Sequence, residues 1–168
     1  MAGSQNEPKA ELPAMTYDPG PEEDLATWPV ALDRLENAST YWLATVRQDG
    51  RPHVMPVWAV WLDNALWLST SERSVKGRNL EREPRCTVTL DAAGMQIVVE
   101  GAARRVSDAA SLQRFADAYA PKYEWPVTVV DGAVTFEDGA EGNVYAVLAE
   151  TVFALSDDGS FTSTRWRL

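Results

Sequence analysis

Apolar and polar side chains alternate along much of this chain, as they do in strands that bury one face. Short turn sequences separate the alternating runs, and the clearest are Asp49-Gly50 and Asp63-Asn64. Two tight turns in succession predict an antiparallel meander. The predicted strands cover residues 40–47, 52–62, 65–70, 85–90, 95–106, 143–155 and 160–167.

Three segments have helical spacing instead. A short basic helix is expected after Ser74 and before Pro84, and another begins at Ser107 or Asp108 and ends at Pro121. The first helix, over residues 22–39, is predicted to bury Leu25, Trp28, Leu32 and Leu35. The third is predicted to bury Leu112, Phe115, Ala116 and Tyr119. Residues 121–142 leave two interpretations open: short strands at 127–130 and 133–136, or an ordered loop.

These elements predict a mostly β fold of six or seven antiparallel strands with short flanking helices. A closed or nearly closed barrel is favoured because closure removes exposed sheet edges, and an open two-layer α+β sheet is the alternative. The chain lacks the βαβ alternation of a Rossmann fold. Residues 1–22 are rich in Pro and Glu and predict a flexible arm, so residues 23–168 form the single expected domain.

Composition narrows the function classes. The net charge of −10 and a pI near 4.5 argue against nucleic acid or an anionic membrane as partner. A single cysteine, Cys86, excludes an internal disulfide and a cysteine-based zinc site, and its apolar surroundings predict a buried, inert thiol. No metal site is predicted. No signal peptide or membrane span is recognisable, so a cytoplasmic protein is expected.

The segment from Ser69 to Arg85 carries the most distinctive chemistry. Hydroxyl groups at the end of a strand precede a basic helix, and a local charge of +3 stands out from the acidic chain. Hydroxyls, helix-start N–H groups and cations together suit a phosphate group. The alternative is an ordinary surface helix whose cations pair with glutamates. The residues concerned are Thr70, Ser71, Ser74, Lys76, Arg78 and Asn79.

Three motifs resemble the pyridoxamine 5′-phosphate oxidase-like, or flavin-reductase-like, split β-barrel superfamily. The first is an opening hairpin, Leu43-Ala44-Thr45-Val46, then Asp49-Gly50-Arg51-Pro52-His53-Val54, then Pro56-Val57-Trp58. The second is Ser74-Val75-Lys76-Gly77-Arg78-Asn79-Leu80 followed by Pro84-Arg85, and the third is Thr164-Arg165-Trp166-Arg167-Leu168. Their order and spacing make the combination specific.

The resemblance implies a homodimer that binds FMN or the deazaflavin coenzyme F420 at its interface. The cofactor ring would lie along His53, Val54, Met55, Pro56, Val57 and Trp58. The phosphate would lie at Ser69, Thr70, Ser74, Lys76 and Asn79. The C-terminal strand would place Arg165 and Trp166 near the ring.

Departures from the family pattern decide between its branches. True pyridoxamine phosphate oxidases have Arg before the helix lysine, whereas this chain has Val75, and their closing motif is absent, so vitamin B6 oxidation is disfavoured. The C-terminal sequence and the spacing from Lys76 to Asn79 look more like the F420-dependent branch.

The resemblance therefore predicts an F420- or FMN-dependent oxidoreductase that transfers a hydride to a small planar acceptor. A non-catalytic cofactor-binding or sequestering protein is the alternative, and haem binding through His53 ranks third. No catalytic residue is assigned because the cofactor carries the chemistry. The acceptor pocket is expected from residues 109–142 and the N-terminal arm.

Overall fold

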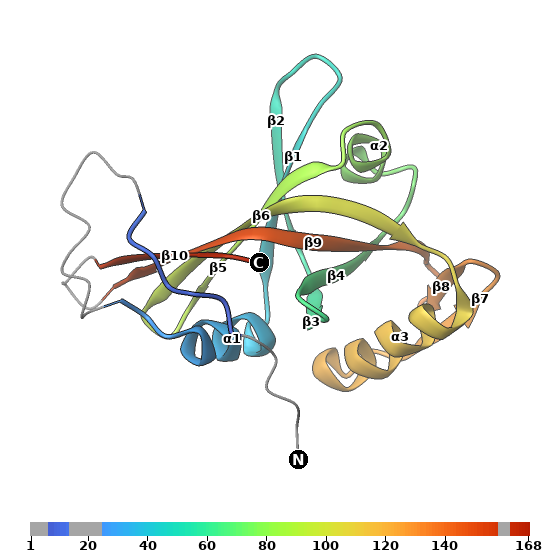
Figure 1. The fold of residues 1–168 in the computed structure, drawn as a ribbon. Helices are drawn as coiled ribbons and strands as arrows, with labels where there is room; N and C mark the ends of the chain where they lie inside the picture. The colour runs from blue at the N-terminus through green and yellow to red at the C-terminus, as the bar shows by residue number, and fades with distance from the viewer. Residues whose placement is uncertain (1–6, 14–24, 158–161) are drawn as a thin grey trace.

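The computed structural model describes residues 7–13, 25–157 and 162–168. In these residues it contains three helices and ten strands (Figure 1). The helices are α1 (Trp28–Asn37), α2 (Val75–Arg82) and α3 (Ala109–Tyr123). The strands are β1 (Tyr41–Val46), β2 (Pro52–Val57), β3 (Ala59–Leu62), β4 (Ala65–Thr70), β5 (Arg85–Ala92), β6 (Met95–Val106), β7 (Val127–Val130), β8 (Ala133–Phe136), β9 (Glu141–Ser156) and β10 (Ser163–Arg167). The fold is mostly β, as predicted, although the predicted number of strands was too low.

One large antiparallel sheet organises the molecule, in the order β2-β1-β5-β6-β9-β4-β3. The 16-residue β9 pairs with β6 and β4, and also with β10 and β8. A bulge between Glu100 and Gly101 bends β6 against it. Gly101 is required there because a Cβ would lie 2.0 Å from the Leu148 carbonyl oxygen. Among the described residues no pairing joins β2 to β3, so the barrel is split rather than closed.

The split occurs inside the single strand predicted over residues 52–62. β2 pairs with β1, where Val57 faces Tyr41, whereas β3 pairs with β4, where Ala59 faces Leu68. The chain therefore crosses from one side of the barrel to the other at Trp58. This break and the additional hairpin at 127–136 account for the extra strands.

Helix α1 begins at Trp28, later than the predicted start at residue 22. Pro29 lies in its first turn, where the absence of an N–H group costs no intrahelical hydrogen bond. Residues 25–27 are not helical, and residues 22–24 lie outside the described part of the chain. The helix buries Trp28, Ala31 and Leu35 against the barrel, so the predicted apolar face is largely confirmed.

Helix α3 continues through Pro121 to Tyr123, so the predicted end at Pro121 is wrong. Proline in a last turn removes only one backbone hydrogen bond, and the helix ends instead at Glu124, which has a left-handed φ of 50°. The following segment forms the β7–β8 hairpin, which confirms the strand interpretation of 127–136. The hairpin and α3 lie together at one end of the sheet (Figure 1).

The core has two parts. One lies between α1 and the larger portion of the barrel and contains Trp28, Trp61 and Trp166. The other lies under α3 and contains Phe115, Tyr119 and neighbouring strand residues. The two parts divide the molecule into a barrel body and an α3 end.

The N-terminal arm is described only at residues 7–13. Glu11 exchanges backbone hydrogen bonds with Arg165 on β10, and both distances are 2.8 Å. This part of the predicted flexible arm therefore lies against the barrel. Residues 1–6 and 14–22, and most of the predicted turn at 157–159, lie outside the described residues.

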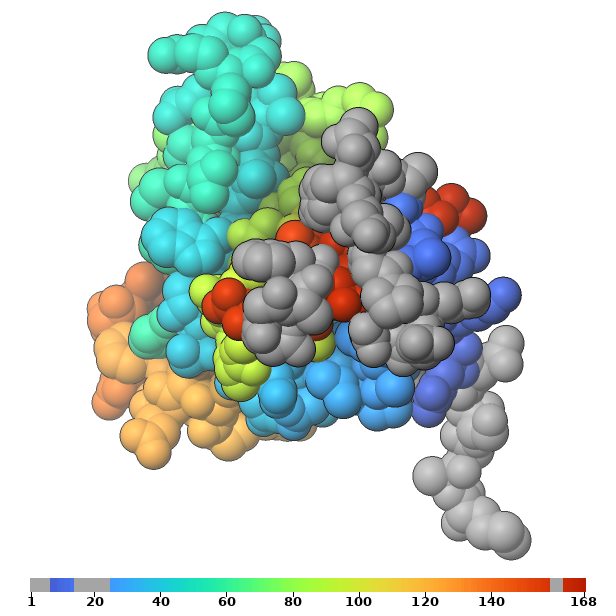
Figure 2. Space-filling view, turned by 90° about the vertical axis from the view of Figure 1, so that its left-hand side faces the viewer, coloured from blue at the N-terminus to red at the C-terminus, as the bar shows by residue number. Residues whose placement is uncertain are grey.

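The β1–β2 hairpin protrudes from the barrel body (Figures 1 and 2). Both of its faces carry exposed apolar side chains, among them Trp42, Val46, Val54 and Met55. In the described residues, none of the helices combines the length and the hydropathy that a bilayer span requires.

Candidate functional site

A cleft at the split of the barrel brings together five of the predicted cofactor residues. We call it the cofactor cleft. It encloses about 390 Å³ between the end of β2, the end of β4, the first turn of α2 and one face of α3. The lining residues are Thr40, Pro56, Val57, Trp58, Ser69, Lys76 and Tyr119.

The start of α2 is built by its capping hydroxyl. Ser74 Oγ accepts a hydrogen bond from the Gly77 N–H at 2.9 Å and lies 2.9 Å from Thr70 Oγ1. Gly77 allows the preceding loop to fold back closely, because a Cβ there would lie 2.3 Å from the Ser71 carbonyl oxygen. Ser74 and Thr70 therefore fix the helix start.

Lys76 is the cation of the cofactor cleft. It is half-buried in the first turn of α2, and it makes no hydrogen bond or ion pair with any described residue. An anion beside it would gain both its charge and the positive end of the helix. The helix start therefore leaves Lys76 available to an anion.

Ser69 lines the cleft, but its hydroxyl lies against Gly142. Its Oγ is buried without a hydrogen-bond partner and occupies space that a side chain at Gly142 would fill. A Cβ at Gly142 would lie 2.1 Å from this oxygen. Ser69 therefore contributes to the wall of the cleft, and its hydroxyl is held within that wall.

Asn79 lies one turn after Lys76 on α2, but its side chain does not line the cofactor cleft. It is 6% exposed, and its Nδ2 donates to Thr45 Oγ1 at 2.9 Å. It lines a separate cavity of about 490 Å³, which we call the arginine pocket. The other lining residues are Arg47, Gln48, Asp49, Arg51, Val75, Arg78 and Arg82. Arg51 pairs with Asp49 at 2.8 Å, so the four guanidinium groups and one carboxylate leave an excess of positive charge around the pocket.

His53 is half-buried on β2 opposite Thr45, and its Nδ1 has no hydrogen-bond partner. Burial lowers the pKa of His53, and the positive charges of Arg47 and Lys76 lower it further. His53 is therefore neutral at physiological pH. It lines neither the cofactor cleft nor the arginine pocket.

The remaining predicted site residues lie outside the cofactor cleft. Val54 and Met55 are exposed on the protruding hairpin. Trp166 is fully buried beside Trp28, because its face of β10 points into the core. Arg165 donates from Nη2 to Glu11 Oε2 at 2.9 Å and holds the N-terminal segment.

Aromatic side chains from α3 and its C-terminal end form one wall of the cofactor cleft. Trp58 stacks on Tyr123 with 4.7 Å between ring centroids and 4° between ring planes. Tyr119 and Trp125 pack against Trp58, with 6.4 and 6.5 Å between the ring centroids. Trp58 remains 45% exposed, so the cluster presents an open aromatic surface.

The last turn of α3 anchors this wall to the strand break. The Tyr123 hydroxyl accepts from Ala59 N–H and donates to the Ala59 carbonyl. Lys122 Nζ donates to that carbonyl, to the Tyr41 hydroxyl and to the Glu36 carbonyl. Burial lowers the pKa of Lys122 to about 8 and raises the pKa of Tyr123 to about 12.

Sequence reasoning missed Lys122, Tyr123 and Trp125, and it assigned Tyr119 only to the core. The row of aromatic residues at 119, 123 and 125 was the available pattern, but the predicted helix end at Pro121 separated its members. Cys86 is buried, and burial raises the pKa of its thiol to about 12, which confirms an inert cysteine. The described residues contain no group of three or more metal-ligating side chains.

Solved structures share this fold at low sequence identity. An F420 reductase is 22% identical, with a TM-score of 0.54, over 71% of this chain and 93% of that protein. A pyridoxamine 5′-phosphate oxidase-related, FMN-binding protein from Nostoc punctiforme is 20% identical, with a TM-score of 0.58, over 84% and 90%. A heme-binding protein from Mycobacterium smegmatis is 22% identical, with a TM-score of 0.57, over 76% and 52%.

No curated protein matches the sequence. The family model for pyridoxamine 5′-phosphate oxidase matches residues 28–153, from the first residue of α1 to near the end of β9. That range contains the split of the barrel, the start of α2 and the whole cofactor cleft. The chain therefore belongs to the pyridoxamine 5′-phosphate oxidase family.

Proposed function

We propose that this protein binds FMN or coenzyme F420 in the cofactor cleft and acts as an oxidoreductase. The observation that carries the proposal is the placement of Lys76, without an ion pair, at a capped helix start beside Pro56, Val57 and Trp58. A phosphate and a planar ring need these two environments next to each other.

The bound cofactor would supply the hydride chemistry, and the protein would position it. Lys76 and the N–H groups of the first turn of α2 would hold the phosphate. The backbone at Pro56 and Val57 would lie along the ring. The aromatic wall at Trp58 and Tyr119 would exclude water and leave space for a small planar acceptor.

The arginine pocket favours coenzyme F420 over FMN. FMN ends at its phosphate, whereas F420 carries carboxylates beyond it and so places more negative charge on the protein. Arg47, Arg51, Arg78 and Arg82 offer that charge a site across α2 from Lys76. Substituting Arg47 and Arg78 together is expected to weaken F420 binding more than FMN binding.

The protruding hairpin supports a homodimer. Trp42 and Val54 are 48% and 51% exposed on β1 and β2, next to the strand end that lines the cleft. Apolar exposure of this kind marks an interaction surface. A second copy packed here would bury the surface and complete the cleft. Light scattering is expected to give a dimer mass, and Trp42→Glu is expected to give a monomer.

The first test is fluorescence titration of cofactor-free protein with FMN and F420 in parallel. Saturable binding of one cofactor is expected, weakened by about 1–3 kcal/mol in Lys76→Ala through loss of a charge-assisted contact. Lys9→Ala removes the same charge from the exposed N-terminal segment and serves as the matched control. Absence of binding, or equal losses in both variants, would contradict the proposed site.

Turnover separates the enzyme from a cofactor-sequestering protein. Oxidation of the reduced, bound cofactor by quinones or nitroaromatic compounds supports the oxidoreductase. Tight binding without turnover supports sequestration. A Soret band on haem addition, with no binding of either flavin-type cofactor, would replace both with haem binding.

A further inference from the structure

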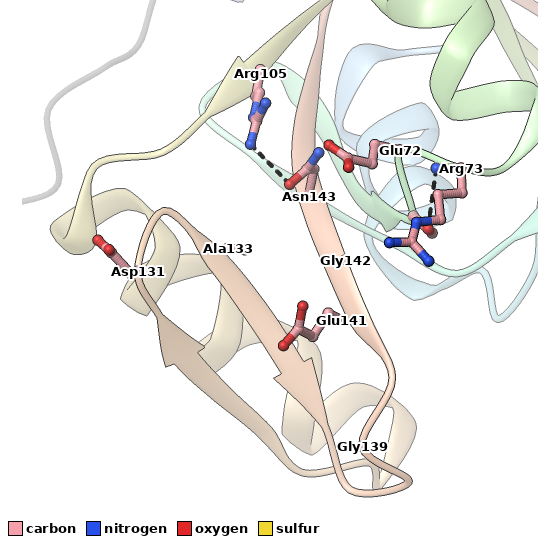
Figure 3. A pocket seen from close by; sticks show the side chains of 10 residues that line it. Glu72, Arg73, Arg105, Asp131, Ala133, Gly139, Glu141, Gly142 and Asn143 are labelled. Atoms are coloured by element: carbon pink, nitrogen blue, oxygen red, sulfur yellow. Dashed lines mark hydrogen bonds between the residues drawn. The ribbon is translucent and has the colours of Figure 1, made fainter.

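A second cavity lies on the far side of the cofactor cleft wall and has no role in the proposed function. It encloses about 500 Å³ between the loop that precedes α2 and the β7–β8 hairpin. Figure 3 shows side chains of both charges around it. Its charged residues are Glu72, Arg73, Arg105, Asp131 and Glu141, and we call it the polar cavity.

One guanidinium of the polar cavity is held in place. Arg105 Nη2 donates to Asn143 Oδ1 at 3.0 Å, and Asn143 is only 8% exposed on β9 (Figure 3). A cation fixed by a buried amide loses less side-chain entropy on binding than a free surface arginine does.

The charges of the polar cavity do not neutralise one another. Among the described residues, no ion pair joins Arg73 or Arg105 to Glu72, Asp131 or Glu141. Two cations and three carboxylates therefore surround one space, and each of them is available to a ligand. All five side chains are exposed to solvent, where a ligand can reach them.

This charge pattern discriminates between ligand classes. A simple anion would be attracted by Arg73 and Arg105 but repelled by the three carboxylates. A simple cation would be attracted by the carboxylates but repelled by the two arginines. The carboxylates do not form a metal cluster within the described residues. Only a ligand that carries separated charges of both signs satisfies the two sets at once.

We propose that the polar cavity binds a small zwitterion of the short-peptide class. Arg105 and Arg73 would hold its carboxylate, and Glu141 and Asp131 would hold its ammonium group. A volume of about 500 Å³ falls in the range of small-molecule sites and accommodates a tripeptide.

The polar cavity is separate from the cofactor cleft. Ser69 and Gly142 form the wall between them, Ser69 lining the cleft and Gly142 lining the cavity. The proposal therefore does not depend on which cofactor, if any, the cleft binds, and Lys76 takes no part in it.

The test is isothermal titration calorimetry of the full chain with triglycine, N-acetyl-triglycine and triglycine amide. The blocked peptides keep the backbone and remove one charge each. Saturable binding of triglycine is expected, with each blocked form about tenfold weaker or more. Absence of saturable triglycine binding, or equal binding of a blocked form, overturns the proposal.

Variants locate the binding. Glu141→Gln and Arg73→Gln are each expected to weaken triglycine binding about tenfold. Neither makes an ion pair or side-chain hydrogen bond that the fold requires, so both are expected to fold, which circular dichroism checks. Lys76→Ala is expected to bind triglycine as the parent chain does. Unchanged binding in Glu141→Gln and Arg73→Gln overturns the assignment to this cavity.

Discussion

The cofactor cleft and the polar cavity share a wall but have opposite chemistry. The cleft has aromatic and apolar walls and one cation, Lys76, whereas the polar cavity has five charged groups and no aromatic side chain. This difference in chemistry follows from the structural elements that line each space. Helix α3 brings its aromatic face to the cleft, and the turn of the β7–β8 hairpin brings Asp131 to the cavity. One short segment, from Ser69 to Lys76, therefore borders two spaces of different chemistry.

The largest expected effect comes from breaking the shared wall. Gly142→Ala places a Cβ 2.1 Å from Ser69 Oγ, and relieving this overlap requires the Ser69 side chain to rotate or β4 and β9 to shift. We expect a loss of about 1–3 kcal/mol in the free energy of unfolding, as in other overpacked cores. Urea denaturation measures it, and ligand affinity in the cleft and in the cavity is expected to fall together.

A second substitution tests the cause. Ser69→Ala removes the buried hydroxyl, which has no partner to lose, so alone it is expected to be nearly neutral. In the double variant, Ser69→Ala with Gly142→Ala, the oxygen that overlaps the new Cβ is absent. The free energy of unfolding is therefore expected to recover. Additive losses in the double variant would show that the contact is not the source of strain.

The next effect separates the two sites. Lys76→Ala is expected to weaken cofactor binding by about 1–3 kcal/mol and to leave triglycine binding unchanged. Glu141→Gln is expected to do the reverse. Parallel titrations of both variants with both ligands measure this, and a variant that weakens both ligands equally would mean that the two spaces act as one site.

A smaller effect is expected at the anchor between α3 and the strand break, which borders the cofactor cleft but not the polar cavity. Tyr123→Phe keeps the ring that stacks on Trp58 but removes two hydrogen bonds to Ala59, at 2.8 and 2.9 Å. Because the Ala59 N–H is left buried and unpaired, we expect a cost of about 1 kcal/mol in thermal or urea unfolding. Cofactor affinity is expected to fall modestly, and triglycine affinity to stay constant.

The smallest effect is a pH dependence at the same anchor. Burial lowers the pKa of Lys122 from its ordinary value to about 8, so above about pH 8 the unfolded chain holds more protons than the folded chain. Stability from this group therefore rises between about pH 8 and pH 10.5, by less than about 1 kcal/mol because the side chain is partly solvent-screened.

Lys122→Met tests this dependence. The variant is expected to lose the rise in unfolding free energy between about pH 7.5 and pH 9.5, which urea denaturation at several pH values measures. The exposed Lys9→Met serves as control and is expected to retain it. An unchanged pH profile in Lys122→Met would assign the rise to another group.

Much of the fold followed from local patterns in the sequence. Alternation and turn dipeptides predicted most strands, since β1, β5 and β6 each bury one face, and Ser74 and Asp108 cap their helices as helix-start residues do. The break at Trp58 was not predictable in this way. Nothing in the alternation of residues 52–62 shows that its two halves pair with different strands.

The candidate site was also predicted only in part, because local sequence patterns identify motifs but not which strands and helices come together. Lys76, Pro56, Val57 and Trp58 belong to two motifs whose spacing in sequence is short, and the structure brings them to one cleft. The burial of Trp166 was not predicted, because strand alternation alone does not say which face of β10 meets the core. The aromatic wall depends on α3 passing Pro121, which propensity argues against.

The position of β9 in the sheet has a consequence for synthesis of the chain. It joins β6 to β4, yet it is the ninth of ten strands along the chain. The β3–β4 and β5–β6 hairpins emerge from the ribosome long before the strand that unites them. The cofactor cleft borders the end of β4, whose last residues pair with Asn143 and Val144, so it cannot assume its final shape until this part of β9 has been translated.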